Sequence, residues 1–303
     1  MSHNSKVGVF LAGLGTGAII ASLVRWGRQG RTMPIDLRKP NLAALECLEA
    51  GYPGIVGALR RLSQTFVKAL PPTTNADVAA DRVVWGLGHA SGEDFKEMLV
   101  LCSNRCGLGA MKVMRGMYER TVTQRYIAIH PDEAQAFLDY HSVHQRKAFK
   151  HLQAIPEAKA LFSAKQIQDI ESNYEAVKGK FQETLCDKCG TLRTQISWSQ
   201  LDIAAMARKA GNGLDTLYAS CYYFPTILAH STVSSVGAYV RGTEDDEIAF
   251  ESDAQAEHVT GAMIGGCCLM LHVLDTQNTY FKLGLDKEIQ DREADLKAFQ
   301  PAS

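Results

Sequence analysis

The residues from Gly107 to Leu152 constrain the fold most, because their pattern predicts two long helices divided at His130-Pro131. In the first half, apolar and aromatic residues recur three and four positions apart, as they do along one face of a helix. This predicted face consists of Met111, Arg115, Tyr118, Val122, Tyr126 and Ile129. The second half begins Pro-Asp-Glu, which is typical of a helix N-terminus because the acids complement the helix dipole. We therefore expect a helical hairpin at the centre of the chain.

The charged side chains of Arg115 and Glu119 belong to this apolar face. They are four residues apart, so they lie one turn from each other on a helix. An unpaired charge is costly to bury, whereas a hydrogen-bonded ion pair is tolerated. We expect the two side chains to form an ion pair inside the core or at its mouth.

The rest of the chain predicts an all-α protein. Its 303 residues, 46% apolar and 21% charged, suffice for a large core, and no convincing strand run or internal repeat occurs. We expect a single multi-helix domain over residues 33–303. In it, Ala254 to Leu283 belongs to the core, and Thr216 to Val240 forms one helix kinked at Pro225.

Residues 1–32 predict an N-terminal membrane anchor with a basic flank. Residues 7–24 carry no charge, and 18 residues in a helix are about the shortest span for a hydrocarbon core of about 30 Å. Basic residues gather after this run, beginning with Arg25, so the positive-inside rule predicts a single-pass protein whose main domain faces the cytoplasm. No signal-peptide cleavage motif follows the run. The letters GLGTG within it lack the strand, third glycine and acidic residue of a dinucleotide-binding turn.

Three small residues, Gly13, Gly17 and Ala21, form a small-xxx-small ladder on the predicted anchor. Such ladders let two membrane helices approach closely, so they suggest a homodimer. The net charge of −1 argues against a broad nucleic-acid-binding surface. The eight cysteines lack the spacing of a disulfide scaffold, and we expect them to be reduced.

A second polar line runs along the predicted helix near Pro225. Tyr222, Thr226 and His230 are four residues apart and could meet the Arg115 and Glu119 side chains across a helix interface. These five residues are our candidate catalytic or ligand-binding residues. The alternative is a buried polar network that only fixes helix packing.

The central segment resembles the bacterial family catalogued as domain of unknown function 5677, over about residues 102–240. The resemblance rests on RGMYERTVTQRYIAIHPDEAQAFLDY, on Trp198 followed by DIAAMARKAG, and on the residues from Tyr218 to Ser231. Arg115, Glu119, Trp198, Tyr222 and His230 match the family pattern, whereas Thr226 replaces its serine and Ser231 its proline. The resemblance implies an α-helical domain and brings no activity with it.

Two R-x4-H strings offer an enzymatic alternative. Arg125 with His130, and Arg146 with His151, resemble the motif of the HEPN ribonucleases, which are helical and often dimeric. The resemblance implies metal-independent RNA cleavage, with histidine as acid or base and arginine beside the phosphate, in a toxin or phage-defence role. We expect instead a noncatalytic or sensory interaction module at the membrane, and the residues leave open whether the protein is an enzyme.

A zinc site is the last possibility that the sequence raises. Cys186 and Cys189 form a C-x-x-C pair, and His141 and His144 lie on one face of the second predicted helix. A zinc site needs three or four converging ligands, and the cysteine pair supplies two. We therefore expect no metal and no cofactor.

Overall fold

A computed structural model describes residues 42–298 except for residues 72, 156–157, 159–160, 187, 243–247 and 251–256. The predicted anchor over residues 7–24 lies outside these described residues, and so does its small-residue ladder. Residues Ala43–Ser303 form one compact unit, and the description that follows concerns that unit alone.

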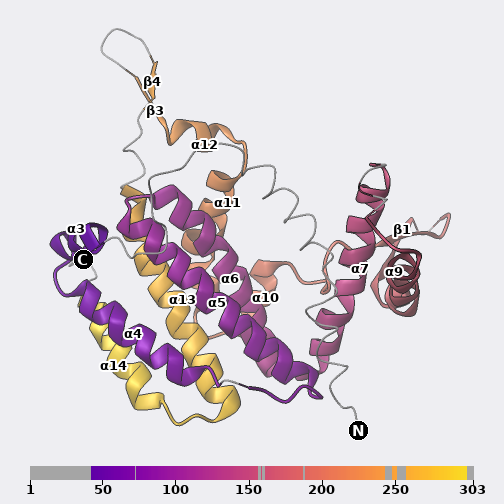
Figure 1. Ribbon diagram of the computed structural model, residues 1–303, viewed down its shortest axis with the longest axis horizontal. Helices are drawn as coiled ribbons and strands as arrows, with labels where there is room; N and C mark the ends of the chain where they lie inside the picture. The colour runs from indigo at the N-terminus through magenta and orange to yellow at the C-terminus, as the bar shows by residue number, and fades with distance from the viewer. Residues whose placement is uncertain are drawn as a thin grey trace. The chain divides into compact units, whose positions relative to one another are not determined.

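Helices make up most of the described chain (Figure 1). The α-helices are α3 Leu42–Gly51, α4 Ile55–Ala69, α5 Ala79–Ser103, α6 Gly107–Ile129, α7 Ala134–Gln153, α9 Ala164–Val177, α10 Ile203–Ala210, α11 Phe224–Ala229, α12 Val233–Gly237, α13 Glu257–Phe281 and α14 Asp286–Lys297. Shorter helical turns are η1 Pro131–Glu133, η2 Lys178–Phe181, η3 Leu214–Leu217 and the π-helical η4 Ala219–Tyr223. Two antiparallel hairpins pair β1 Gln182–Cys186 with β2 Thr191–Thr194, and β3 Val240–Gly242 with β4 Ile248–Phe250.

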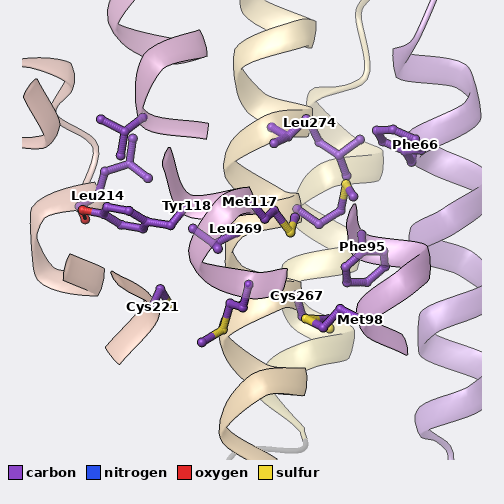
Figure 2. Close-up of a cluster of buried hydrophobic side chains, with 14 of the residues drawn as sticks. Phe66, Phe95, Met98, Met117, Tyr118, Leu214, Cys221, Cys267, Leu269 and Leu274 are labelled. Atoms are coloured by element: carbon purple, nitrogen blue, oxygen red, sulfur yellow. Dashed lines mark hydrogen bonds between the residues drawn. The ribbon is translucent and has the colours of Figure 1, made fainter. Parts of the chain in front are cut away.

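Helices α5, α6 and α13 pack against one another and form the centre of the fold (Figure 1). Helix α6 also contacts α10, η4 and α11, while α4 and α14 pack on α13. Figure 2 shows part of the resulting core, in which labelled side chains come from α4, α5, α6, α13 and the segment after α10. Because α6 touches so many elements, four of the six residues on its predicted face are buried and Arg115 is half-buried.

Two glycines allow the central helices to approach closely. A Cβ atom added at Gly92 of α5 would overlap the ring of Phe66, and one at Gly266 of α13 would overlap the side chain of Met98. Phe66 and Met98 are both buried (Figure 2). Large side chains thus fill the space that the missing Cβ atoms leave, which is how a dense core is achieved here.

A smaller core forms where α7 packs on α9 and the β1–β2 hairpin follows. It contains Tyr140, Val143, Tyr174 and Phe181. The hydroxyl of Tyr140 donates to the carbonyl oxygen of Gln195 at 2.8 Å, which ties the end of the hairpin to α7. This second core holds in place the segment that carries Cys186 and Cys189.

The structure confirms the all-α class and the helical hairpin divided at His130-Pro131. It adds two short β-hairpins that we did not predict. The segment from Thr216 to Val240, predicted as one kinked helix, is instead divided among η3, η4, α11 and α12. Ile129, predicted on the buried face of α6, is 48% exposed because α6 ends there. The cysteines whose side chains the structure describes are all free.

Among the described residues, the segment His258–Phe281 of α13 is the one helix long and apolar enough to cross a membrane. More than half of it is buried inside the protein, against α5 and α6. A central core helix has the same composition as a membrane span, because both are surrounded by apolar groups on nearly all sides. We therefore assign α13 to the core, in agreement with the sequence.

Candidate functional site

The best-defined polar site lies between α6 and the segment 214–229. Tyr118 of α6 is fully buried, and its hydroxyl donates to the carbonyl oxygen of Leu214 at 2.9 Å. The rings of Tyr218 and Tyr222 pack on Tyr118, with ring centroids 6.3 and 5.8 Å from it. These contacts fix η4 and α11 beside the α6 face that carries Arg115 and Glu119.

Four predicted site residues meet there, and we call them the Arg115 cluster: Arg115, Glu119, Tyr222 and Thr226. The Nε of Arg115 donates to Oγ1 of Thr226 at 2.7 Å, and its Nη2 donates to Oε1 of Glu119 at 3.1 Å. Its guanidinium also lies over the ring of Tyr222, 5.0 Å from the centroid. Thr226 in turn donates its hydroxyl proton to the carbonyl oxygen of Tyr222 at 2.6 Å. The guanidinium is thus held by partners from two segments more than a hundred residues apart.

The Arg115 cluster lies at the mouth of the core rather than inside it. The side chain of Arg115 is 29% exposed and that of Glu119 is 41% exposed. Tyr222 is half-buried, and its pKa is raised, mainly because burial disfavours the phenolate and next because the carboxylate of Glu119 is near. The phenol therefore stays protonated over the whole neutral range and can act as a donor there.

The backbone beneath this cluster is irregular. The π-helical turn Ala219–Tyr223 is followed directly by α11, whose first turn contains the buried Pro225. Such turns insert an extra residue into a helix and are frequent at functional sites. Here the turn brings Tyr222 and Thr226 to face α6 together.

His230 is not part of the Arg115 cluster. It is the residue that ends α11, with an extended backbone at φ −94° and ψ 161°, and its side chain is exposed. In the described part of the chain no hydrogen bond or ring contact joins its imidazole to the cluster. The predicted polar line thus ends at Thr226, because the helix ends at Ala229.

The arginines of the two R-x4-H strings have partners other than the histidines of their motifs. Arg125 donates to Asp275 at 2.7 Å and Arg146 donates to Glu171 at 2.9 Å, so each arginine already has a carboxylate partner. The ring of His130 packs on Tyr126 with centroids 4.5 Å apart. His151 is exposed in the last turn of α7. Among the described residues, no hydrogen bond or ring contact joins either arginine to the histidine of its own motif.

Within a single chain, the four candidate zinc ligands lie on two separate elements and do not come together. Cys186 and Cys189 flank the turn between β1 and β2, whereas His141 and His144 lie on α7. His144 packs edge-on against Tyr140, and its pKa is lowered by burial and then by the charge of Lys147. Within the described residues, no group of three or more His, Cys, Asp or Glu side chains could hold a metal ion.

The sequence interpretation missed a polar group at the other end of α6. Asp275 of α13 accepts hydrogen bonds from Arg125 at 2.7 Å and from the side chain of Asn212 at 3.1 Å, and His272 lies 3.5 Å from the same asparagine nitrogen. The pKa of His272 is lowered, chiefly by burial and next by the charge of Arg125. His272 and Asp275 are three residues apart within an apolar helix, which is the signal that could have found them.

Two fully buried glutamines were also missed. Gln124 of α6 and Gln277 of α13 both donate to the carbonyl oxygen of Val84, at 3.0 and 2.9 Å. They join all three central helices at one carbonyl group. Gln124 and Gln277 have a structural role, since solvent reaches neither side chain.

Comparison with known proteins gives one match. The profile of a family of unknown function, DUF5677, matches residues 83–248, which include α6, the Arg115 cluster and both predicted R-x4-H strings. No curated protein and no solved structure matches the chain. Since the match covers more than half of the 303 residues, the chain belongs to the DUF5677 family.

Proposed function

We propose that this protein is a noncatalytic interaction module, held at a membrane by residues 7–24 and facing the cytoplasm. One observation carries the proposal: large apolar side chains are exposed along the segment that follows the Arg115 cluster. We call this the 223–250 surface, and it consists of Tyr223, Phe224, Val233, Val236, Ile248 and Phe250. Clusters of exposed apolar groups on one segment are typical of sites that bind another protein.

The 223–250 surface is supported from within the fold. Tyr223 and Phe224 contact each other edge to face at 5.8 Å, and Phe250 stacks on Tyr239 at 5.7 Å with ring planes 5° apart. Helix α12, whose Val233 is 90% exposed, contacts both α11 and β3. Apolar side chains held in this way by their neighbours lose little further freedom when a partner covers them.

The Arg115 cluster supports a positioning role rather than catalysis. Its guanidinium is engaged by a hydroxyl, a carboxylate and an aromatic ring, all from the same chain. These contacts attach α11 to α6. Helix α11 carries Phe224 of the 223–250 surface and is followed by most of that surface. The ribonuclease alternative gains little support, because Arg125 and Arg146 are both paired with carboxylates.

A site-specific photocrosslinking experiment on the full chain in its native membrane tests the proposal. A photoreactive residue at Val233 or Phe250 is expected to give an adduct of one defined mass, and Val233→Glu is expected to abolish the adduct formed from position 250. Position 67 is the matched control, since Val67 is 73% exposed on α4, away from this segment. Absence of a defined adduct would contradict the proposal. RNA cleavage or toxicity that disappears in His130→Ala and His151→Ala would favour the ribonuclease instead.

A further inference from the structure

The turn between β1 and β2 presents two thiol groups together. Thr184 pairs with Leu192 across the hairpin and Cys186 with Thr191, and Cys189 lies in the turn between them. The backbone N–H of Gly190 donates to the carbonyl oxygen of Cys186 at 2.9 Å. Gly190 has a φ of +64°, a left-handed conformation that glycine adopts without strain. The sequence C-x-x-C-G therefore folds back on itself and holds both cysteines on one short loop.

The sulfur of Cys189 lies 2.9 Å from the hydroxyl of Thr191, and the pKa of its thiol is lowered to about 7, first by Thr191 and next by the nearby Cys186 thiol. Cys189 is exposed and Cys186 is half-buried, so both sulfur atoms are accessible. Two adjacent thiols can bind one soft metal ion through two bonds, and Zn²⁺ in structural sites takes four ligands at tetrahedral positions. One hairpin thus supplies half of such a site.

The other half does not come from the described part of the same chain. No third histidine, cysteine or carboxylate among these residues joins the pair. A second copy of the hairpin, related by a twofold axis, would bring two more thiolates to a metal ion lying on that axis. Closed twofold pairing is the commonest arrangement of identical chains, and it uses the same residues on both sides.

One residue beside the cysteines fits this arrangement. Leu185, which precedes Cys186, is 59% exposed on the hairpin. A second hairpin brought to the same metal ion would cover it.

We propose that two copies of this chain bind one Zn²⁺ ion between their β1–β2 hairpins through Cys186 and Cys189 of each copy. Four thiol protons leave as four zinc–sulfur bonds form, and no oxidant or reductant is required. The site links two cytoplasmic bodies at a point distant in sequence from the predicted anchor. The proposed zinc site does not depend on the 223–250 surface, so either proposal can be correct if the other is wrong.

Metal titration of the full chain in detergent tests this site. The protein is reduced with a phosphine, stripped with a chelator, desalted and titrated with Zn²⁺ against a chromophoric competitor, and then with Co²⁺ as a spectroscopic probe. The expected results are one metal ion per two chains and the visible spectrum of tetrahedral cobalt with four thiolates. Cys189→Ser should abolish both, whereas Cys106→Ser, which changes a half-buried thiol elsewhere, should leave both unchanged.

A variant that keeps all four thiols tests the contact between hairpins. Leu185→Glu is expected to lower the zinc affinity by about tenfold or more, because it replaces an apolar contact with two like charges. Three results would overturn the proposal: no metal binding, one metal ion per chain with nitrogen ligands from His141 or His144, or unchanged binding in Cys189→Ser. Unchanged affinity in Leu185→Glu would overturn the packing of hairpin on hairpin.

Discussion

Thr226 contributes more to the stability of the Arg115 cluster than Glu119 does. The hydroxyl of Thr226 accepts a charged hydrogen bond at 2.7 Å and is half-buried, whereas the Glu119 side chain is 41% exposed to solvent. Thr226→Val should therefore lower the free energy of unfolding by about 1–2 kcal/mol. Glu119→Gln should lower it by no more than about 1 kcal/mol, as is usual for exposed ion pairs. Urea unfolding followed by circular dichroism gives both values.

Thr226→Ser is the matched control for this comparison, since it keeps the hydroxyl and removes one methyl group. It should unfold close to the wild-type midpoint. A loss of about 3–5 kcal/mol in Glu119→Gln would mean that the pair behaves as a buried one, as a core interior would require. Equal losses in Thr226→Val and Thr226→Ser would show that the methyl group, and not the hydrogen bond, matters.

His272 makes the fold sensitive to acid. Burial and the charge of Arg125 lower its pKa, although the nearby carboxylates of Asp275 and Glu293 act in the opposite direction. The unfolded chain, with a histidine pKa of about 6.5, then binds the proton more readily than the folded protein. Stability should thus fall as the pH drops below about 6.5, and less so in His272→Gln. Urea midpoints at about pH 7.5 and about pH 5.5 measure the difference, with the exposed His151→Gln as the control. Identical pH dependence in wild type and His272→Gln would contradict this assignment.

At the scale of single residues, helical spacing correctly predicted that Arg115 and Glu119 meet. The same spacing wrongly placed His230 beside them. Arg115 and Glu119 are on one regular helix, so four-residue spacing places them correctly. His230 follows the last residue of α11, where the chain becomes extended and the spacing no longer applies. The Asp275 group was missed because its members come from α6, α13 and a loop, and only the tertiary structure brings them together.

Helix α5 depends on close approach at Gly92. A Cβ atom there would overlap the ring of Phe66, which is buried and cannot move away freely. Gly92→Ala should therefore lower the free energy of unfolding by about 1–3 kcal/mol. Gly86→Ala on the same helix meets nothing within 4 Å and should raise it by about 0.5–1 kcal/mol, because alanine favours helix over glycine. Urea unfolding midpoints compare the two variants. If Gly92→Ala stabilised the protein, the ring of Phe66 would not be packed on Gly92 as described.

At the scale of elements, packing overrides the local pattern in two places. Glycine weakens a helix, yet α5 runs unbroken from Ala79 to Ser103 through Gly88 and Gly92, since these two glycines face the large side chains of Gln277 and Phe66. The strands of the β1–β2 hairpin were not predicted because they are mostly exposed and show no alternation of apolar and polar residues. Their turn is nonetheless readable in the sequence, as Gly190 follows the second cysteine.

At the scale of the whole molecule, the class and the family were predicted correctly, the class from long periodic segments and the family from motifs such as RGMYERTVTQRYIAIHPDEAQAFLDY. Apolar periodicity in α6, α7 and α13 is enough to indicate an all-helical core. The segment of α13 is apolar enough to span a membrane, and its burial against α5 and α6 supports the core assignment made from the sequence. Two segments of the chain, residues 7–24 and α13, therefore compete as explanations of any membrane association.

The attachment of the full chain to membranes should depend on residues 7–24 alone. The full chain is expected to stay in the membrane fraction after an alkaline carbonate wash, and a chain that begins at Thr32 is expected in the supernatant, because α13 is already covered by other helices. A chain with Gly13→Arg and Ile19→Arg serves as a full-length control and should also be released, since a charge in the middle of a membrane helix costs about 2.5–3.5 kcal/mol. A cysteine introduced at the exposed position of Val67 reports orientation: an impermeant thiol reagent should increase its labelling over that of the wild-type chain in inverted vesicles and not in right-side-out cells. If the chain from Thr32 stays in the membrane fraction, the anchor is not residues 7–24, and α13 becomes the element to test next.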